Sequence, residues 1–318
     1  TTTNPIKRAG PKMMTAVNNE PVFEHDPVTG HSLGIRQESG RTNLIGDSEA
    51  RTGVNYIGSG GYVEYQTGVL DPEGKQGTVH VFRATNPSVY NVCDLYTSGQ
   101  SQGNVYTSSV YLKAIGDTTG TVRLQSSQNG GFYAYLDIDF SRSDGADPID
   151  TVTSSAPTDG TTALTGNDSA ISYHAEKCGG GWYRVGVTYN ITTSSSGNIY
   201  RIALLADSGR NKNHGVAIWG YQVEAGYSMS SYMPNGATRA QDVTLYPAGR
   251  LEEKAFTEDK GSFLVKYKVN QPTNTFPRLF SSDQGNDLIC AVVASENAGT
   301  MGHTYFQVYN PGTQTIQA

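Results

Sequence analysis

The sequence predicts an all-β protein. From about Leu44 onward, short segments recur that either alternate apolar and polar residues or are rich in β-branched and aromatic residues. Clusters of Gly, Ser, Asn or Asp separate nearly every pair of these segments, and hardly any stretch shows the periodicity of a helix. Short strands in succession, with turn residues between them, are typical of a β-sandwich or a β-barrel.

The expected strands of the central region follow one another closely. They are residues 61–66, 78–84, 104–114, 121–125, 132–140, 182–189, 199–206 and 216–225. A polar stretch at 141–170 interrupts this succession and contains hardly any large apolar residue. Structureless loops of such length are commonly functional or disordered. We interpret this one either as a surface excursion or as a loop that faces a ligand or a partner.

The two flanks differ from the central region. Residues 1–22 have no periodicity and contain three prolines, so we expect an extended arm that lies on another surface. We assign residues 1–43 to this arm and the leading segment after it, residues 44–245 to the main sandwich, and residues 246–318 to a further unit. Strands expected in the further unit are 261–270, 278–282, 287–294 and 303–310.

Composition argues against several classes of function. Only 16% of the 318 residues are charged, against about 25% in average proteins. This suits exposed strands, and also a surface specialised for neutral ligands such as glycans. A net charge of −6 argues against nucleic-acid binding, and no apolar run approaches the ~20 residues of a membrane span. The scattered cysteines Cys93, Cys178 and Cys290 are expected to be free and mostly buried.

The sequence offers no recognisable catalytic or metal motif. The six histidines lack metal-ligand spacing, and no nucleophile elbow, P-loop or dinucleotide motif occurs in a suitable context. We therefore expect no enzymatic activity and no cofactor. The acidic residues between 137 and 150 do not follow EF-hand spacing. Asp144, Asp147 and Asp150 are nevertheless candidates for a structural calcium site, with a chance acidic loop as the alternative.

The segment 132–140 carries the candidate ligand-binding residues. Because neighbouring side chains of a strand point to opposite faces, its apolar residues predict a core face. The opposite face carries Tyr133, Tyr135, Asp137 and Asp139. Rings beside carboxylates suit the apolar faces and hydroxyls of a sugar, but an ordinary exposed strand would have the same pattern. Asp137 and Asp139 could also form a catalytic pair, although nothing in the sequence indicates a raised pKa.

Trp182 is a further candidate. Alternation in 182–189 predicts a core face formed by Tyr183, Val185, Val187 and Tyr189. Trp182 and Arg184 then lie on the opposite face. We interpret Trp182 either as a platform for a sugar or as half of a stacked structural pair with Arg184.

Two longer motifs resemble a known family. The leading motif, Phe23–Leu44, reads FEHDPVTGHSLGIRQESGRTNL, and the closing motif, Val216–Ala240, reads VAIWGYQVEAGYSMSSYMPNGATRA. Together they are similar to a recurring module of bacteriophage tail proteins, in which "DPVTG…RTNL" precedes a β-sandwich and "WGAQLE-G…TSYIPT…TRAAD" closes it. VYTSSVYLKA at 105–114 and GWYRVGVTY at 181–189 are also similar to strands of that family, so the resemblance covers residues 20–245.

This resemblance implies a jelly-roll sandwich like that of carbohydrate-binding modules, with Trp219 in or beside its core. It also implies the start of a second, concanavalin- or laminin-G-like sandwich. The residues after 245 are too few for a whole one, so we expect either a longer chain or completion by another subunit. The implied protein is a virion component of the tail fibre or receptor-binding apparatus, assembled in the bacterial cytoplasm. It would contact other virion proteins, attach to a host-surface glycan and form a homotrimer.

Two alternatives remain at this point. A non-lectin structural protein, such as an adaptor, a capsid decoration or a head-fibre protein, would bury Tyr133, Tyr135 and the 141–170 stretch in subunit contacts. A glycan depolymerase or esterase would place carboxylates together in a groove. In the family, the sandwich normally accompanies a catalytic domain of a different kind, and the sequence shows no such domain.

Overall fold

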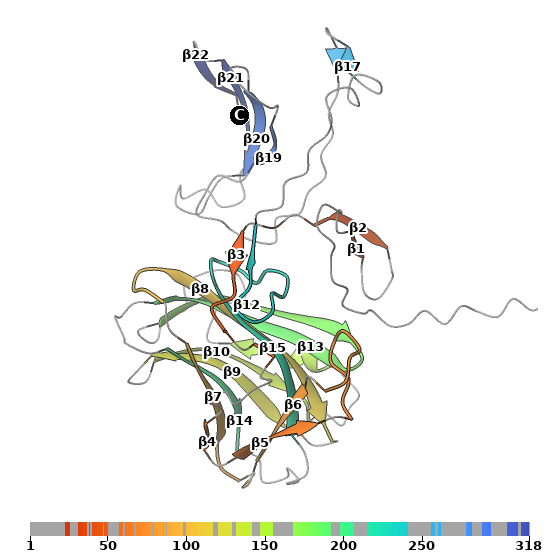
Figure 1. Cartoon of the computed structure of the whole chain (residues 1–318). Coiled ribbons are helices and arrows are strands. Elements are labelled where there is room, and N and C mark those ends of the chain that lie inside the picture. Colours follow the sequence, from red (N-terminus) through yellow and green to blue (C-terminus); the bar gives the residue numbers. More distant parts are fainter. Residues whose placement is uncertain are drawn as a thin grey trace, which may run out of the picture. The chain divides into compact units, whose positions relative to one another are not determined.

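The structure of the chain is a computed structural model (Figure 1). It describes residues 23–25, 31–36, 38, 40–46, 48–49, 57–59, 61–66, 68–77, 79–84, 86, 88–97, 100–116, 120–128, 132–141, 147–154, 168–191, 198–206, 215–240, 256–257, 260–261, 278–281, 288–293, 304–310 and 313–317. The chain divides into two compact units, residues 1–247 and 248–318, and each is described by itself. The expected arm at 1–22 lies outside the described residues.

The first unit is a β-sandwich of two six-stranded antiparallel sheets, which confirms the predicted all-β class. The β9 sheet has the order β11 (Thr153–Ser154), β10 (Phe132–Asp139), β9 (Thr121–Gln128), β14 (Asn198–Leu204), β7 (Asn91–Thr97) and β4 (Ile57–Ser59). The β8 sheet has the order β12 (Asp168–Gly179), β13 (Trp182–Ile191), β8 (Val105–Ile115), β15 (Gly215–Ala225), β6 (Val79–Ala84) and β5 (Gly61–Gln66).

The strands pair in a nested order. β6 pairs with β15, β7 with β14, β8 with β13, and β9 with β10. Successive pairs alternate between the two sheets, as they do when one long antiparallel ribbon is rolled into a sandwich. Eight strands therefore form a nested set divided between the two sheets, and the jelly-roll identity of the sandwich stays a prediction. The other four strands, β4, β5, β11 and β12, lie at the edges of the sheets.

Every strand expected in the central region is present, but the sequence did not predict β4, β7, β11 and β12. The polar stretch at 141–170 is also not structureless throughout. Its described part contains the short 3-10 helix η1 (Pro148–Thr151), the strand β11 and the first residues of β12. Residues 142–146 and 155–167 lie outside the described residues.

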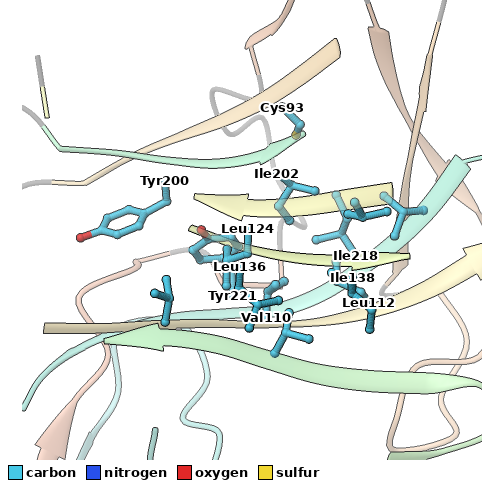
Figure 2. Packing of buried hydrophobic residues seen from close by; sticks show 14 of the residues in the cluster. Cys93, Val110, Leu112, Leu124, Leu136, Ile138, Tyr200, Ile202, Ile218 and Tyr221 are labelled. Atoms are coloured by element: carbon cyan, nitrogen blue, oxygen red, sulfur yellow. The ribbon is translucent and has the colours of Figure 1, made fainter. Parts of the chain in front are cut away.

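The main core lies between the two sheets and follows from the alternation of the strands. Ala134, Leu136 and Ile138 of β10 are fully buried, as the alternation predicts. Figure 2 shows Leu124, Leu136 and Ile138 of the β9 sheet together with Val110, Leu112 and Ile218 of the β8 sheet. The inward residues of β13 confirm the predicted core face and are Tyr183, Val185, Val187 and Tyr189.

A second, smaller core covers the outer face of the β8 sheet. Its buried members are Val79, Val81, Tyr111, Trp182, Ala217 and Trp219. Val69 and Tyr232, from segments beside the sheet, pack against this cluster. The β8 sheet is therefore covered on both faces in its middle strands, which explains why nearly every residue of β13 and β15 is buried, including polar ones. The expected packing of Trp219 is confirmed, because it is only 2% exposed.

Two small sheets complete the first unit. β1 (Phe23–His25) pairs with β2 (Ser32–Ile35), and β3 (Arg41–Thr42) pairs with β16 (Thr238–Arg239). β3 belongs to the leading motif and β16 to the closing motif. Their antiparallel pairing means that the chain enters and leaves the sandwich side by side (Figure 1).

The second unit contains six described strands. β17 (Phe256–Thr257) pairs with β18 (Lys260–Gly261). β19 (Arg278–Ser281), β20 (Leu288–Val293), β21 (Thr304–Asn310) and β22 (Thr313–Gln317) form a four-stranded antiparallel meander. Most of the expected strand at 261–270 lies outside the described residues, and the concanavalin-like identity of this unit stays a prediction. Among the residues described in either unit, no helix is long and apolar enough to cross a membrane.

Candidate ligand-binding face

The outer face of the β9 sheet carries a continuous strip of polar and aromatic side chains. Tyr135 lies opposite Gln125, Gln125 opposite Arg201, and Arg201 opposite Asp94, so one line of residues crosses β10, β9, β14 and β7. Asp137 lies opposite Arg123 in the neighbouring line, two residues along each strand and therefore on the same face. We call the set Tyr90, Asp94, Arg123, Gln125, Tyr135, Asp137 and Arg201 the polar strip.

Two bidentate ion pairs organise the polar strip. Arg123 donates from Nε and Nη2 to the two carboxylate oxygens of Asp137, both at 2.7 Å. Arg201 donates in the same way to Asp94, at 2.5 and 2.7 Å. The guanidinium side chains stay 23% and 21% exposed, so both pairs reach the surface of the sheet. Such forked pairs fix the orientation of both groups.

Tyr90 joins the two ion pairs. It lies in the segment just before β7, is 40% exposed, and donates its hydroxyl hydrogen to Oε1 of Gln125 at 3.1 Å. Partial burial raises the pKa of Tyr90, and the nearby cations Arg123 and Arg201 oppose this without cancelling it. The hydrogen bond to Asp137 raises the pKa of Arg123, and that to Asp94 raises the pKa of Arg201. Both guanidinium groups are therefore held in the charged form.

Tyr135 forms a flat platform with Arg123. The guanidinium carbon lies 3.9 Å from the ring centroid, the geometry of a cation–π contact. One face of the ring is therefore occupied by Arg123. The flat surface that the strip offers at β10 and β9 is built from the ring and the guanidinium together.

The structure brings two of the residues predicted on 132–140 into this strip and gives a third, Asp139, another partner. Tyr135 and Asp137 are members of the polar strip. The Asp139 carboxylate instead accepts hydrogen bonds from the backbone N–H and hydroxyl of Ser141, at 2.9 and 2.6 Å. The Tyr133 backbone pairs with Ser127 in the ladder, and its side chain lies outside the described residues.

Trp182 lies on the other sheet and is a packing residue. It is 2% exposed, and its Nε1–H donates to the backbone oxygen of Leu70 at 3.0 Å. Its ring is therefore covered and not available to stack on a sugar. The predicted pairing with Arg184 is replaced by another contact, because the Arg184 guanidinium lies over the Tyr111 ring, 5.1 Å from its centroid.

Of the three calcium candidates, Asp147 has a structural role in the described region. Asp147 caps η1 by accepting the Ile149 N–H, and its other carboxylate oxygen forms an ion pair with Lys177. Burial raises the pKa of Asp147, but Lys177 and the other hydrogen bonds outweigh this and leave it lowered. Asp150 is exposed on η1, and Asp144 lies outside the described residues. Within the described part of the chain, no cluster of His, Cys, Asp and Glu could hold a metal ion.

Sequence reasoning missed five members of the strip: Tyr90, Asp94, Arg123, Gln125 and Arg201. The alternation in β9 and β14 does contain a local signal, because Val122, Leu124 and Ile202 are buried while Arg123 and Arg201 face away from the core. The sequence did not reveal that β10, β9, β14 and β7 are neighbours.

The two family-like motifs meet in a separate cluster. Asn43 of the leading motif accepts hydrogen bonds from the N–H groups of Ile45 and Val223, at 3.0 and 3.1 Å. Its amide nitrogen donates to the backbone oxygens of Met233 and Tyr221, at 2.8 and 3.3 Å. A single buried side chain thus links the segment that leads into the sandwich to its last strand and to the segment after it.

The closing motif supplies the rest of this cluster. Glu224, fully buried, accepts hydrogen bonds from the Gln222 side chain and from the N–H and hydroxyl of Ser230, at 2.8, 2.8 and 2.6 Å. Arg41 lies 3.7 Å from the same carboxylate. Glu38 accepts the Ser231 N–H at 2.7 Å and pairs with Arg239. We call Glu38, Arg41, Asn43, Gln222, Glu224, Ser230 and Arg239 the motif clasp.

The comparisons with known proteins give no assignment. No protein-family model matches this chain, and no curated protein matches it significantly. The fold therefore places the chain in the class of all-β sandwich proteins.

Proposed function

We propose that this chain is a structural protein of the tail-fibre or receptor-binding apparatus of a phage particle, and that its sandwich attaches to a cell-surface glycan. The observation that carries the proposal is the polar strip. It combines aromatic rings, fixed guanidinium groups and carboxylates on one face, across four neighbouring strands. The resemblance of the two motifs to the phage module supplies the virion context.

The chemistry of the strip suits a sugar. A sugar ring offers apolar C–H faces surrounded by hydroxyl groups, and each hydroxyl both donates and accepts hydrogen bonds. Tyr90 and Tyr135 supply rings, Arg123 and Arg201 supply oriented donors, and the paired carboxylates supply acceptors. Val89, beside Tyr90, adds an exposed apolar side chain.

The proposed role is adhesion without catalysis. Glycosidases need two carboxylates that can act as acid and as base or nucleophile. Asp137 is engaged by Arg123 and Asp139 by Ser141, so each of these carboxylates already has a structural partner. In the proposed homotrimer, three weak sites on one particle would act together, and this avidity reduces the affinity that each site needs.

One observation favours a second candidate, a virion protein that binds no sugar. The carboxylates of the strip already have partners, and Arg123 lies over one face of the Tyr135 ring. A surface satisfied in this way could also pack against another virion protein, as an adaptor, decoration or head-fibre protein would.

A glycan array separates the two candidates. We expect the purified chain to bind at least one glycan, and Tyr90→Ala and Tyr135→Ala to weaken that binding. Lys75→Ala is the control, because Lys75 is an exposed side chain paired only locally with Glu73. Binding that survives both tyrosine substitutions would place the site elsewhere. Absence of binding by the unaltered protein would favour the non-lectin role.

A further inference from the structure

The polar strip also indicates what kind of glycan it would accept. We infer that the strip selects an uncharged oligosaccharide that lies across β10, β9, β14 and β7. This inference rests on the proposed function. Acidic saccharides, which carry uronic or sialic acids, should bind less well. Three features carry this inference: the charge balance of the strip, the hydrogen-bonding groups that its ion pairs present, and its length.

Charge balance disfavours an acidic ligand. Arg123 is neutralised by Asp137 and Arg201 by Asp94, in both cases through both carboxylate oxygens. Asp139 adds a further carboxylate at the end of β10. The strip therefore contains no excess of positive charge, in a chain whose net charge is −6. A carboxylate on the ligand that approached either arginine would also be repelled by the aspartate paired with that arginine.

The hydrogen-bonding groups match hydroxyls. A guanidinium has five N–H donors, of which a bidentate carboxylate takes two, and each carboxylate oxygen can accept more than one hydrogen bond. Each ion pair therefore places donors and acceptors side by side in a fixed plane. A hydroxyl can use both kinds of group at once, whereas a ligand carboxylate can only accept.

The length of the strip indicates an oligosaccharide. One ion pair spans β10 and β9, the other spans β14 and β7, and Gln125 and Tyr90 lie between them. Strands in a sheet are about 4.8 Å apart, so the four strands extend over roughly 14 Å. A ligand that contacts both ion pairs must therefore be longer than one sugar ring.

The test uses an array that pairs neutral oligosaccharides with acidic counterparts. The neutral probes contain glucose, galactose, mannose, rhamnose or N-acetylglucosamine, and the acidic probes carry glucuronic, galacturonic or sialic acid. We expect binding to neutral probes that changes little between low and high salt, because no net charge is neutralised. Arg123→Lys and Arg201→Lys, which keep the charge but lose the fork, should each weaken binding about tenfold. Lys75→Ala should bind as the unaltered protein does.

A second variant tests the charge argument directly. Asp94→Asn with Asp137→Asn keeps the shapes of the side chains but leaves two uncompensated cations in the strip. We expect this double variant to lose affinity for neutral probes and to gain affinity for acidic ones, with strong salt dependence. Thermal unfolding of each variant shows whether it is folded. If the double variant does not fold, the Arg123→Lys and Arg201→Lys variants still test whether the polar strip binds the glycan.

The outcomes separate this inference from the proposed function. Binding by the unaltered protein to acidic probes alone would overturn the neutral preference and leave glycan attachment standing. Neutral binding that both Arg→Lys variants retain would overturn the assignment to the strip. Absence of binding to every probe would overturn the proposed function, and the inference with it.

Discussion

Asn43 and Val223 are joined by a hydrogen bond of 3.1 Å, although they are 180 residues apart in the sequence. The backbone continues this contact, because the Leu44 N–H donates to the Val223 oxygen at 2.7 Å. The leading and closing motifs are therefore two halves of one structural feature. They fix the place where the chain enters and leaves the sandwich. The residues that form these contacts are not members of the polar strip.

Removing the Asn43 side chain should destabilise the sandwich. Asn43→Ala would leave the four backbone groups that it binds without their partner in a buried region. We expect a loss of about 3 kcal/mol in the free energy of unfolding, measured by urea denaturation. Thr42→Ala, which removes only the exposed bond between Thr42 and Thr238, should cost less than about 0.5 kcal/mol. Equal losses for the two variants would contradict the role given to Asn43.

Glu38 should make stability depend on pH. Burial raises its pKa, but Arg36, Arg239 and Ser231 outweigh this and leave the pKa below the ordinary 4.5. As the pH falls, the unfolded chain binds a proton at this residue before the folded protein does. The contribution of Glu38 is therefore complete above pH 4.5 and is lost as the pH falls through the folded-state pKa.

We therefore expect the unaltered protein to lose more stability than Glu38→Gln on acidification through this range. Urea midpoints measured along a pH series provide the comparison. Arg239→Gln removes one of the cations that hold the pKa down, so its pH dependence should be intermediate. Parallel curves for the unaltered protein and Glu38→Gln would rule this explanation out.

Gly226 occupies a position that other residues cannot fill without strain. Its φ is +129°, and an added Cβ would lie 2.0 Å from Nη1 of Arg41. Arg41 is held there by the Ala225 oxygen and by Glu224. Gly226→Ala should therefore cost about 3 kcal/mol of unfolding free energy, from backbone strain and from displacement of Arg41.

Gly103→Ala is the matched control for Gly226. Gly103 also has a positive φ, of +82°, but an added Cβ would meet nothing within 4 Å. Its cost should be limited to the backbone strain of about 1 kcal/mol. A thermal-unfolding comparison of the two variants tests whether the larger φ of Gly226 and its contact with Arg41 together add to the cost. Similar values for both variants would show that they do not.

Trp182 should act on stability and not on ligand binding. Trp182→Ala leaves a cavity in the second core and should lower the free energy of unfolding by about 3–5 kcal/mol. Trp182→Phe keeps an aromatic ring but loses the hydrogen bond to the Leu70 oxygen. That loss should add about 1 kcal/mol to the small cost of an otherwise conservative core substitution. Leu70→Ala is the control, because it keeps the backbone oxygen that Trp182 binds and removes only an exposed side chain. A folded Trp182→Phe variant that lost glycan binding on the array would contradict the packing role.

Two of the cysteines should react slowly in the folded protein. Burial raises the pKa of Cys178 to about 12 and raises that of Cys93 well above its usual range. Little reactive thiolate is then present at mildly alkaline pH. Alkylation followed by mass spectrometry should show slow labelling of both residues in buffer and rapid labelling in urea. Equal rates in the two conditions would contradict their burial.

The polar strip shows how far alternation alone can lead. The pattern of 132–140 separates Leu136 and Ile138 from Tyr135 and Asp137, and the structure confirms that division between a core face and an outer face. For Trp182, the alternation of the strand is not sufficient to predict the surroundings of the side chain. It correctly predicts the face opposite the main core, but that face is covered by the second cluster instead of by solvent. A strand pattern identifies two faces and cannot say what covers each one.

The sequence by itself determined the all-β class, most strands and the inward residues of the sandwich, because strand periodicity and turn residues are local properties. Only the tertiary structure decided that Arg123 meets Asp137, that Arg201 meets Asp94, and that Asn43 binds Val223. Strand order depends on which ladders together bury the most apolar surface, and many orders share the same local pattern. Contacts between strands distant in sequence therefore follow from the packing of the whole sandwich.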